Sequence, residues 1–325
     1  MKSAGKGILT MAYGEPRYLR QAINFAKSLI VTNPNTARAI ITDSPENPKL
    51  KKYFHHLIPI RKEFGRGMVQ KVFVYEYSPF EETLCIDADC FALRPFDDLW
   101  KAMSAKPYAL FGQMLTHNNE WFNYIETYRK LLNKPAIPGV SGGVHYFNRS
   151  PQAQAIADRA MALAMDFRSI ATQADVPIPP NDETCLSFAF AEAGIEPVDD
   201  SKLRRQIGPM QMMNAKVICD VPRHRFRCIT SDAAYDSFIM HFYWDWDKGF
   251  HYDRETLKLN LAVDFGISPS VASTMVNTLL NPGYYLFTET YRRIKRIKSP
   301  SENIPRMTCW PYSHFGGGLR SRIKL

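Results

Sequence analysis

The chain has 325 residues, of which 45% are hydrophobic and 13% aromatic, enough for one large α/β domain or a domain with an appendage. No stretch approaches the ~20 apolar residues of a membrane helix, and the first residues lack the apolar core of a secretory signal. Six cysteines without a C-x-x-C pair argue against a zinc site and a disulfide scaffold, so we expect reduced thiols and a cytoplasmic protein. The net charge of +9 is compatible with nucleic acid, an anionic membrane or anionic sugars as partners.

The first segments predict a β–helix–β unit. Residues 7–12 and 37–42 are apolar runs with the length of buried strands, and residues 18–30 carry apolar side chains at helical spacing. This order favours a parallel sheet, in which the carboxyl ends of the strands meet at one edge.

Ala12, Tyr13 and Asp43 follow these two strands and are therefore expected at that edge. An aromatic ring there can stack on a nucleobase, and a carboxylate can accept hydrogen bonds from a base or a ribose. Packing of Tyr13 on its loop and helix capping by Asp43 are the structural alternatives.

The segment from Thr83 to Asp89 carries the strongest signal. Residues 83–86 have the length of a buried strand, and Asp87 and Asp89 directly follow it. In an extended chain the two carboxylates project to the same face, and their mutual repulsion favours a cation between them. Mn²⁺ or Mg²⁺ takes carboxylate oxygens and leaves positions for phosphate oxygens. A turn with two solvated carboxylates is the structural alternative.

The chain contains no G-x-G-x-x-G and no Walker A sequence, so phosphate binding requires a metal and basic side chains. Lys71 lies in a predicted helix over residues 69–77, where a solvated lysine is the structural interpretation. Residues 140–148 predict a strand in which Gly142 and Gly143 permit close backbone approach to a ligand.

Two later segments add polar candidates. Asp182 and Glu183 open a predicted helix that continues to residue 193, where the helix dipole favours acidic side chains and capping alone explains them. Residues 236–243 predict a strand that delivers His241, and a lone histidine is commonly a structural residue.

The Asp-x-Asp strand resembles the DxD region of GT-A fold glycosyltransferases, most closely the nucleotide-sugar transferases of glycosyltransferase family 8. Further on, residues 140–148 resemble the family's Asn-Ser-Gly-Val-x-x-Phe-Asn segment, residues 182–184 its Asp-Gln-Asp segment, and residues 241–248 its His-Phe-x-Gly-x-x-Lys element. The chain departs from these patterns at the following positions: Ser141, Gly142, Glu183, Thr184 and the spacing of Lys248.

The resemblance implies roles for these residues. Asp87, Asp89 and His241 would ligate Mn²⁺ or Mg²⁺. The nucleotide-sugar donor would contact the residues Ala12, Tyr13, Asp43, Lys71, Gly142, Gly143 and Lys248. Asp182 and Glu183 would face the sugar, Glu183 either as a general base for inversion or as a carboxylate beneath the anomeric carbon; retention is suspected, and inversion stays open.

The fold implied by the resemblance is the α/β GT-A fold, a Rossmann-like mixed sheet with flanking helices, over residues 1–250. The implied activity is metal-dependent transfer of a sugar from a nucleoside-diphosphate sugar, expected to be UDP-linked, to a carbohydrate or lipid-linked acceptor, as in cell-envelope polysaccharide synthesis. Nucleic acid is not expected as a partner.

Residues 251–325 are expected to form a helical, aromatic and basic extension. Helical patterns over residues 254–263 and 269–280 precede the aromatic residues 284–287 and five basic residues between Arg292 and Lys298. This composition suits peripheral contact with an anionic membrane at its inner face. A helix that packs its aromatic residues on the domain is the alternative.

Two other functions fit the same motifs. An apolar strand followed by Asp-x-Asp is also the nucleophile signature of haloacid-dehalogenase-like phosphatases, although the motif lies far from the N-terminus and Cys90-Phe91 replaces the usual following residue. A non-catalytic nucleotide- or carbohydrate-binding protein on a transferase fold is the third hypothesis.

Overall fold

The computed structural model describes residues 4–65, 67–119, 122, 124–166, 181–212, 215–243, 250–280 and 283. The chain divides into two units, the first made of Met1–Cys90 and Pro95–Arg204 and the second of Phe91–Arg94 and Arg205–Leu325. The division after residue 250 expected from the sequence stays a prediction.

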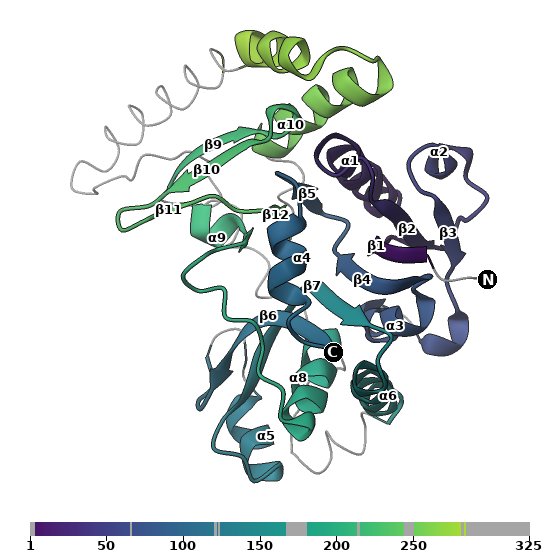
Figure 1. Ribbon diagram of the computed structural model, residues 1–325, viewed down its shortest axis with the longest axis vertical. Coiled ribbons are helices and arrows are strands. Elements are labelled where there is room, and N and C mark those ends of the chain that lie inside the picture. The colour runs from purple at the N-terminus through teal and green to yellow at the C-terminus, as the bar shows by residue number, and fades with distance from the viewer. Residues whose placement is uncertain are drawn as a thin grey trace, which may run out of the picture. The chain divides into compact units, whose positions relative to one another are not determined.

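A six-stranded mixed sheet forms the centre of unit 1 (Figure 1). Its order is β3 (His56–Pro59), β2 (Ala37–Thr42), β1 (Ala4–Met11), β4 (Phe80–Ile86), β7 (Ile137–Asn148) and β6 (Tyr108–Leu115). The first four strands are parallel, whereas β7 runs antiparallel to β4, and β6 antiparallel to β7. The predicted α/β class with a mixed sheet is confirmed.

Helices flank this sheet, with α1 (Pro16–Thr32) on one side and α6 (Pro151–Met165) and α8 (Asp182–Ala193) on the other (Figure 1). The shorter helices of unit 1 are α2 (Pro48–Lys51), α3 (Val74–Tyr77), α4 (Asp97–Met103) and α5 (Ile125–Leu131), with 3₁₀ turns η1 (Lys62–Phe64) and η2 (Gly67–Phe73). Helix α8 ends at Gly194, whose φ of 67° is the left-handed conformation that glycine adopts without strain.

The segment expected as one helix over residues 69–77 is instead the 3₁₀ turn η2 followed by the short helix α3. Gln70 explains part of this difference, because its side-chain amide donates to the carbonyls of Arg61 and Gly65, both at 2.8 Å. These bonds tie the segment to the preceding loop and favour a tight local turn.

Alternate residues of the strands supply the core of unit 1. Leu9 and Ile41 face a buried cluster that contains Phe147 and Phe190, and neighbouring Ile8 is equally buried, since successive strand residues point to opposite faces. Each such side chain contributes about 1.5–3 kcal/mol when fully buried. The sheet is therefore covered on both faces, and its strand ends are left as the place for a polar site.

Unit 2 contains two small sheets. One has the order β5 (Cys90–Ala92), β12 (Ile239–His241), β8 (Gln206–Ile207), and the other β11 (Ala234–Tyr235), β10 (Arg225–Ile229), β9 (Lys216–Asp220). Phe91 stacks on Tyr252 at 4.8 Å between ring centroids and meets Phe242 edge-on at 5.4 Å. These contacts explain why residues 91–94 belong to unit 2.

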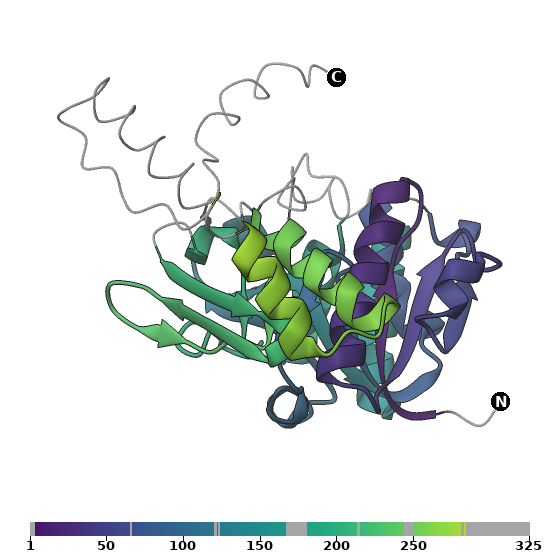
Figure 2. The ribbon, with the colours of Figure 1, turned by 90° about the horizontal axis from the view of Figure 1, so that it is seen from above.

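The helical part of unit 2 comprises α9 (Pro209–Met212), the 3₁₀ turn η3 (Val221–Arg223), α10 (Phe250–Leu259), which continues as a π-helix (Asn260–Asp264), and a helix over residues 269–280. Figure 2 shows this last helix beside α10. The predicted helices over 254–263 and 269–280 are confirmed, whereas residues 284–325, with the aromatic and basic run, lie outside the described residues. No helix in the part of the chain that the structure describes is long and apolar enough to cross a bilayer.

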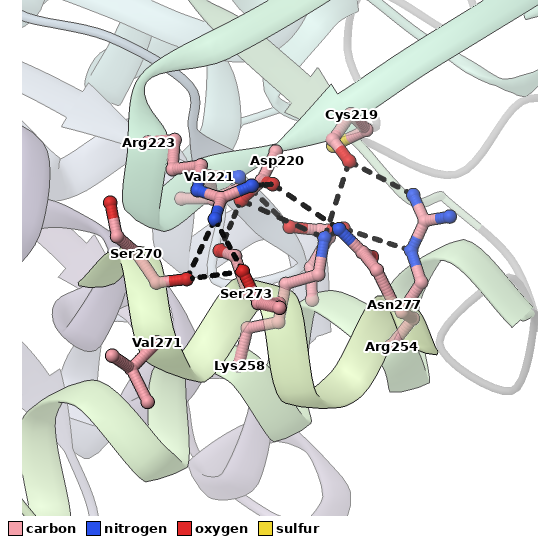
Figure 3. A network of polar contacts seen from close by, with 12 residues as sticks. Cys219, Asp220, Val221, Arg223, Arg254, Lys258, Ser270, Val271, Ser273 and Asn277 are labelled. Atoms are coloured by element: carbon pink, nitrogen blue, oxygen red, sulfur yellow. Dashed lines mark hydrogen bonds and ion pairs between the residues drawn. The ribbon is translucent and has the colours of Figure 1, made fainter. Parts of the chain in front are cut away.

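A buried polar network links α10 to strand β9 (Figure 3). Lys258 and Glu255 are both fully buried, and their Nζ and Oε1 atoms lie 2.8 Å apart. The second carboxylate oxygen of Glu255 accepts the Val221 N–H at 2.8 Å, and the carbonyl of Cys219 accepts hydrogen bonds from Arg254 and Lys258. Both buried charges are thus paired and hydrogen-bonded, as burial requires.

The same network reaches the helix over residues 269–280. The Asp220 carboxylate accepts hydrogen bonds from Ser273 Oγ and, at 3.4 Å, from Asn277 Nδ2 (Figure 3). Arg223 donates to the Ser270 carbonyl and to Thr274 Oγ1, both at 2.7 Å. The end of β9 and the turn η3 are therefore held by side chains and carbonyls from the last described helix.

Candidate functional site

The residues that follow β1 and β2 meet at the carboxyl edge of the parallel strands, as predicted. The Ala12 N–H donates to the Ile41 carbonyl at 2.9 Å, and the Gly14 N–H donates to Asp43 Oδ2 at 2.8 Å. The Tyr13 hydroxyl donates to the Gly67 carbonyl at 2.7 Å. Tyr13 is thus hydrogen-bonded to the first residue of η2.

Asp43 stabilises the turn after β1 and does not cap the next helix. Asn47 caps α2, because its side chain accepts the Lys49 N–H at 3.0 Å. The roles of Tyr13 and Asp43 toward a nucleotide stay predictions.

Lys71 of η2 connects three other parts of the same edge. Its Nζ lies 2.8 Å and 3.1 Å from the two carboxylate oxygens of Asp87, directly after β4, and 3.0 Å from Asp182 Oδ2, in the first turn of α8. It also donates to the Gly142 carbonyl of β7 at 2.8 Å. Residues that the sequence placed in separate motifs therefore meet around one ammonium group.

The electrostatic balance keeps Lys71 charged. Burial favours the neutral amine, but the negative charges of Asp182 and Asp87 outweigh it and raise the pKa of Lys71 well above its ordinary value. With 19% of the Lys71 side chain exposed, the ammonium interacts with the two carboxylates under limited solvent screening.

A bulge in β7 places its glycines at this point. Leu110 pairs with His145 and Phe111 with Ser141, so residues 142–144 of β7 have no partner in β6. On the other side the Asp87 N–H donates to the Gly143 carbonyl at 3.1 Å. Bulges of this kind locally redirect a strand and are common beside active sites.

Gly142 is required by close approach and not by its backbone angles. A Cβ atom at this position would overlap the Asp182 carboxylate. The Gly142 N–H instead donates to Glu183 Oε1 at 2.8 Å. The paired-glycine signal in the sequence thus marks contact between β7 and α8.

The first turn of α8 presents the two acidic residues. Asn181 is its cap, with its side-chain oxygen accepting the Thr184 N–H at 2.7 Å, so Asp182 and Glu183 are not needed as caps. Burial and the charge of Asp182 raise the pKa of Glu183, while the Gly142 N–H and Lys71 oppose this shift. The pKa of Glu183 is therefore higher than that of an exposed glutamate.

His145 also lies in this site, although no sequence motif predicted it there. Its side chain is fully buried, and its Nε2 lies 3.0 Å from the Gly142 carbonyl oxygen and 3.8 Å from Asp182 Oδ2. Burial and the charge of Lys71 lower the pKa of His145 to about 4, so the ring is neutral. A histidine inside the otherwise apolar run Val144–Phe147 was the available signal.

The structure brings together Lys71, Asp87, Gly142, Asp182 and Glu183, with Gly143 hydrogen-bonded to Asp87. His241 ends β12 in unit 2, with Nδ1 2.8 Å from Gln206 Nε2. Lys248 lies outside the described residues.

Carboxylates gather at this edge of unit 1. Asp87 and Asp182 pair with the Lys71 ammonium, Glu183 accepts the Gly142 N–H, and Asp89 lies in the turn after β4. Carboxylate oxygens are the type of ligand that Mg²⁺ and Mn²⁺ bind in proteins.

Among known proteins, the chain is similar to several solved structures. No family model and no curated protein sequence matches the chain. A structure of the galactosyltransferase LgtC with donor and acceptor sugar analogues is 13% identical with a TM-score of 0.47, covering 74% of this chain and 87% of that chain. Mouse xyloside xylosyltransferase 1 in its apo form is 13% identical with a TM-score of 0.43, covering 73% and 97%.

The glycosyltransferase GlyE of Streptococcus pneumoniae TIGR4 is 14% identical with a TM-score of 0.39, covering 60% of this chain and 45% of that chain. All three similar proteins are glycosyltransferases, the class that the sequence motifs resemble. These are similarities of fold.

Proposed function

We propose that the chain is a glycosyltransferase that moves a sugar from a nucleoside-diphosphate sugar, UDP-linked, to a carbohydrate or lipid-linked acceptor. The observation that carries this proposal is the meeting of Lys71, Asp87 and Asp182 at the carboxyl edge of β4. Open α/β sheets bind their ligands at this edge. A charged, partly buried cluster there suits a ligand that is both polar and anionic.

Asp182 and Glu183 suit the sugar end of such a donor. Carboxylates stabilise the positive charge that develops at an anomeric carbon in the transition state. A carboxylate below this carbon corresponds to retention, whereas activation of the acceptor hydroxyl by Glu183 corresponds to inversion. The anomeric configuration of the product, read by NMR, distinguishes the two.

Asp87, Asp89 and His241 are the residues that would hold Mn²⁺ or Mg²⁺, as the sequence motif predicts. A divalent cation bound there would neutralise charge on the departing diphosphate. Lys248 would add a positive side chain near the same group. Asp89→Asn is expected to weaken Mn²⁺ binding at least about tenfold in calorimetry and to leave the fold intact, because the loss of one charged ligand removes no core volume. Unchanged Mn²⁺ affinity would contradict the ligand assignment.

The direct test is a panel of nucleotide sugars with the purified full chain, with Mn²⁺ or Mg²⁺ and with EDTA. Release of nucleoside diphosphate and binding by calorimetry are the readouts, with Asp182→Asn as the inactive variant and Asp158→Asn, on the exposed face of α6, as the matched control. Absence of both binding and hydrolysis for every donor would refute the proposal. Tight UDP binding without turnover would instead support a binding protein, and phosphate release abolished by Asp87→Asn would support a phosphatase.

A further inference from the structure

The peptide groups of Gly142 are hydrogen-bonded to several polar and charged residues of the site. The Gly142 carbonyl accepts hydrogen bonds from Lys71 Nζ at 2.8 Å and from His145 Nε2 at 3.0 Å, so each of its lone pairs has a donor. The N–H of the same residue donates to Glu183. Any rotation of this segment would move the partners of both Lys71 and Glu183.

The bulge leaves Gly142 with little support from the sheet. Residues 142–144 have no partner in β6, so the ladder hydrogen bonds that normally fix a strand are missing on that side of Gly142. The Lys71 ammonium, itself held by Asp87 and Asp182, is one donor to this carbonyl. A second donor on a rigid buried ring would fix the direction of the carbonyl more closely than Lys71 alone.

His145 is such a donor. A carbonyl oxygen only accepts, so the Nε2 atom carries the proton, and Nδ1 faces the Tyr108 hydroxyl at 3.5 Å. The ring is enclosed, with His145 paired to Cys85 of β4 and to Leu110 of β6. His145, the residue after the bulge, is thus hydrogen-bonded to the carbonyl of Gly142, the residue that begins the bulge.

We propose that His145 is a positioning residue: its Nε2–H fixes the Gly142 carbonyl, which in turn holds the Lys71 ammonium between Asp87 and Asp182. For catalysis this inference rests on the proposed transferase function. A histidine that served only core packing would be satisfied by any buried acceptor. Here the acceptor is the same oxygen that binds Lys71, and Asp182 lies 3.8 Å away.

Two substitutions distinguish a positioning role of His145 from a role in core packing alone. His145→Leu removes the donor and keeps an apolar side chain, whereas His145→Gln keeps an N–H donor at the place of Nε2. With the best nucleotide-sugar donor, we expect kcat/KM to fall on the order of 10-fold to 100-fold in His145→Leu and to be largely restored in His145→Gln. Equal activity of a folded His145→Leu variant, or equal losses in both variants, would overturn the proposal.

Two readouts do not depend on turnover. ¹⁵N NMR of the wild-type imidazole should show the neutral Nε2–H tautomer, and the opposite tautomer would overturn the proposal even if His145→Leu failed to fold. Hydrogen exchange of the Gly142 amide should accelerate in His145→Leu and stay slow in His145→Gln. If the wild type uses no nucleotide sugar, the proposed function fails while these two measurements still decide whether His145 holds Gly142.

Discussion

The Lys71 ammonium lies 3.0 Å from the Asp182 carboxylate and so joins the segment before β4 to the first turn of α8. Asp87 lies on the other side of the same nitrogen. The cation is what allows two carboxylates to share this small volume, since like charges at such separations repel.

Lys71→Met is expected to lower the free energy of unfolding by about 2 kcal/mol or more, because Asp182, only 3% exposed, would lose its cation. Urea denaturation at neutral pH measures this. Lys62→Met, at an exposed position of η1, is the matched control and should change stability by no more than about 0.5 kcal/mol. If the two variants had equal free energies of unfolding, the ion pairs of Lys71 would make no net contribution to stability.

Gly142→Ala is expected to destabilise unit 1 by about 1–3 kcal/mol, because the added methyl group would overlap the Asp182 carboxylate and force it away from Lys71. Donor turnover should fall in parallel. Gly5→Ala in β1 serves as the control, since a Cβ there meets nothing within 4 Å. If Gly142→Ala had the melting temperature and the turnover of the wild type, the first turn of α8 would relax around the added methyl group without a loss of stability.

His145 should make stability depend on pH. Its pKa is about 4 when folded and 6.5 as a free side chain, so between these values the unfolded chain binds more protons and stability falls as the pH is lowered. At pH 5 this amounts to about 2 kcal/mol relative to pH 8. His145→Gln lacks the titrating ring, so its unfolding free energy should fall by that much less over the same range. Parallel pH profiles would contradict a buried neutral ring.

Glu183 should give stability the opposite dependence on pH. Its raised pKa means that the folded chain holds this proton more tightly than the unfolded chain, so its contribution to stability is lost as the pH rises through the folded pKa. Glu183→Gln removes this loss and keeps an oxygen for the Gly142 N–H. The stability of the variant relative to wild type should therefore increase from pH 4 to pH 8, while turnover falls if the carboxylate is catalytic. A relative stability independent of pH would contradict the shift.

Local patterns were sufficient to predict the central strands of unit 1 and the longer helices, whereas β3 and the strands β9, β10 and β11 were not predicted. Residues 37–42 coincide with β2, residues 83–86 form the end of β4, and residues 140–148 lie within β7. The position of Asp87 at the sheet edge followed from the same patterns, because an apolar run and its first polar successor are both local features.

The pairing of distant segments was not predictable in the same way. Nothing near Lys71 in the sequence specifies Asp182 as its partner, and the register shift between Leu110 and Phe111 depends on how β6 and β7 meet in three dimensions. The contacts of His145 depend on that shift, so its place in the site did not follow from a histidine in an apolar strand alone. The single helix expected at residues 69–77 was wrong because the preceding loop, through Gln70, competes with helix formation.

The polar network of unit 2 also bears on how the chain is made. Asp220 is completed by Ser273 and Asn277, which the ribosome adds 53 and 57 residues later. Chains emerge with the N-terminal end first, so a nascent chain that has released only β9 and β10 carries a carboxylate without these partners. The Asp220 carboxylate therefore gains both of these partners only after Asn277 has left the exit tunnel.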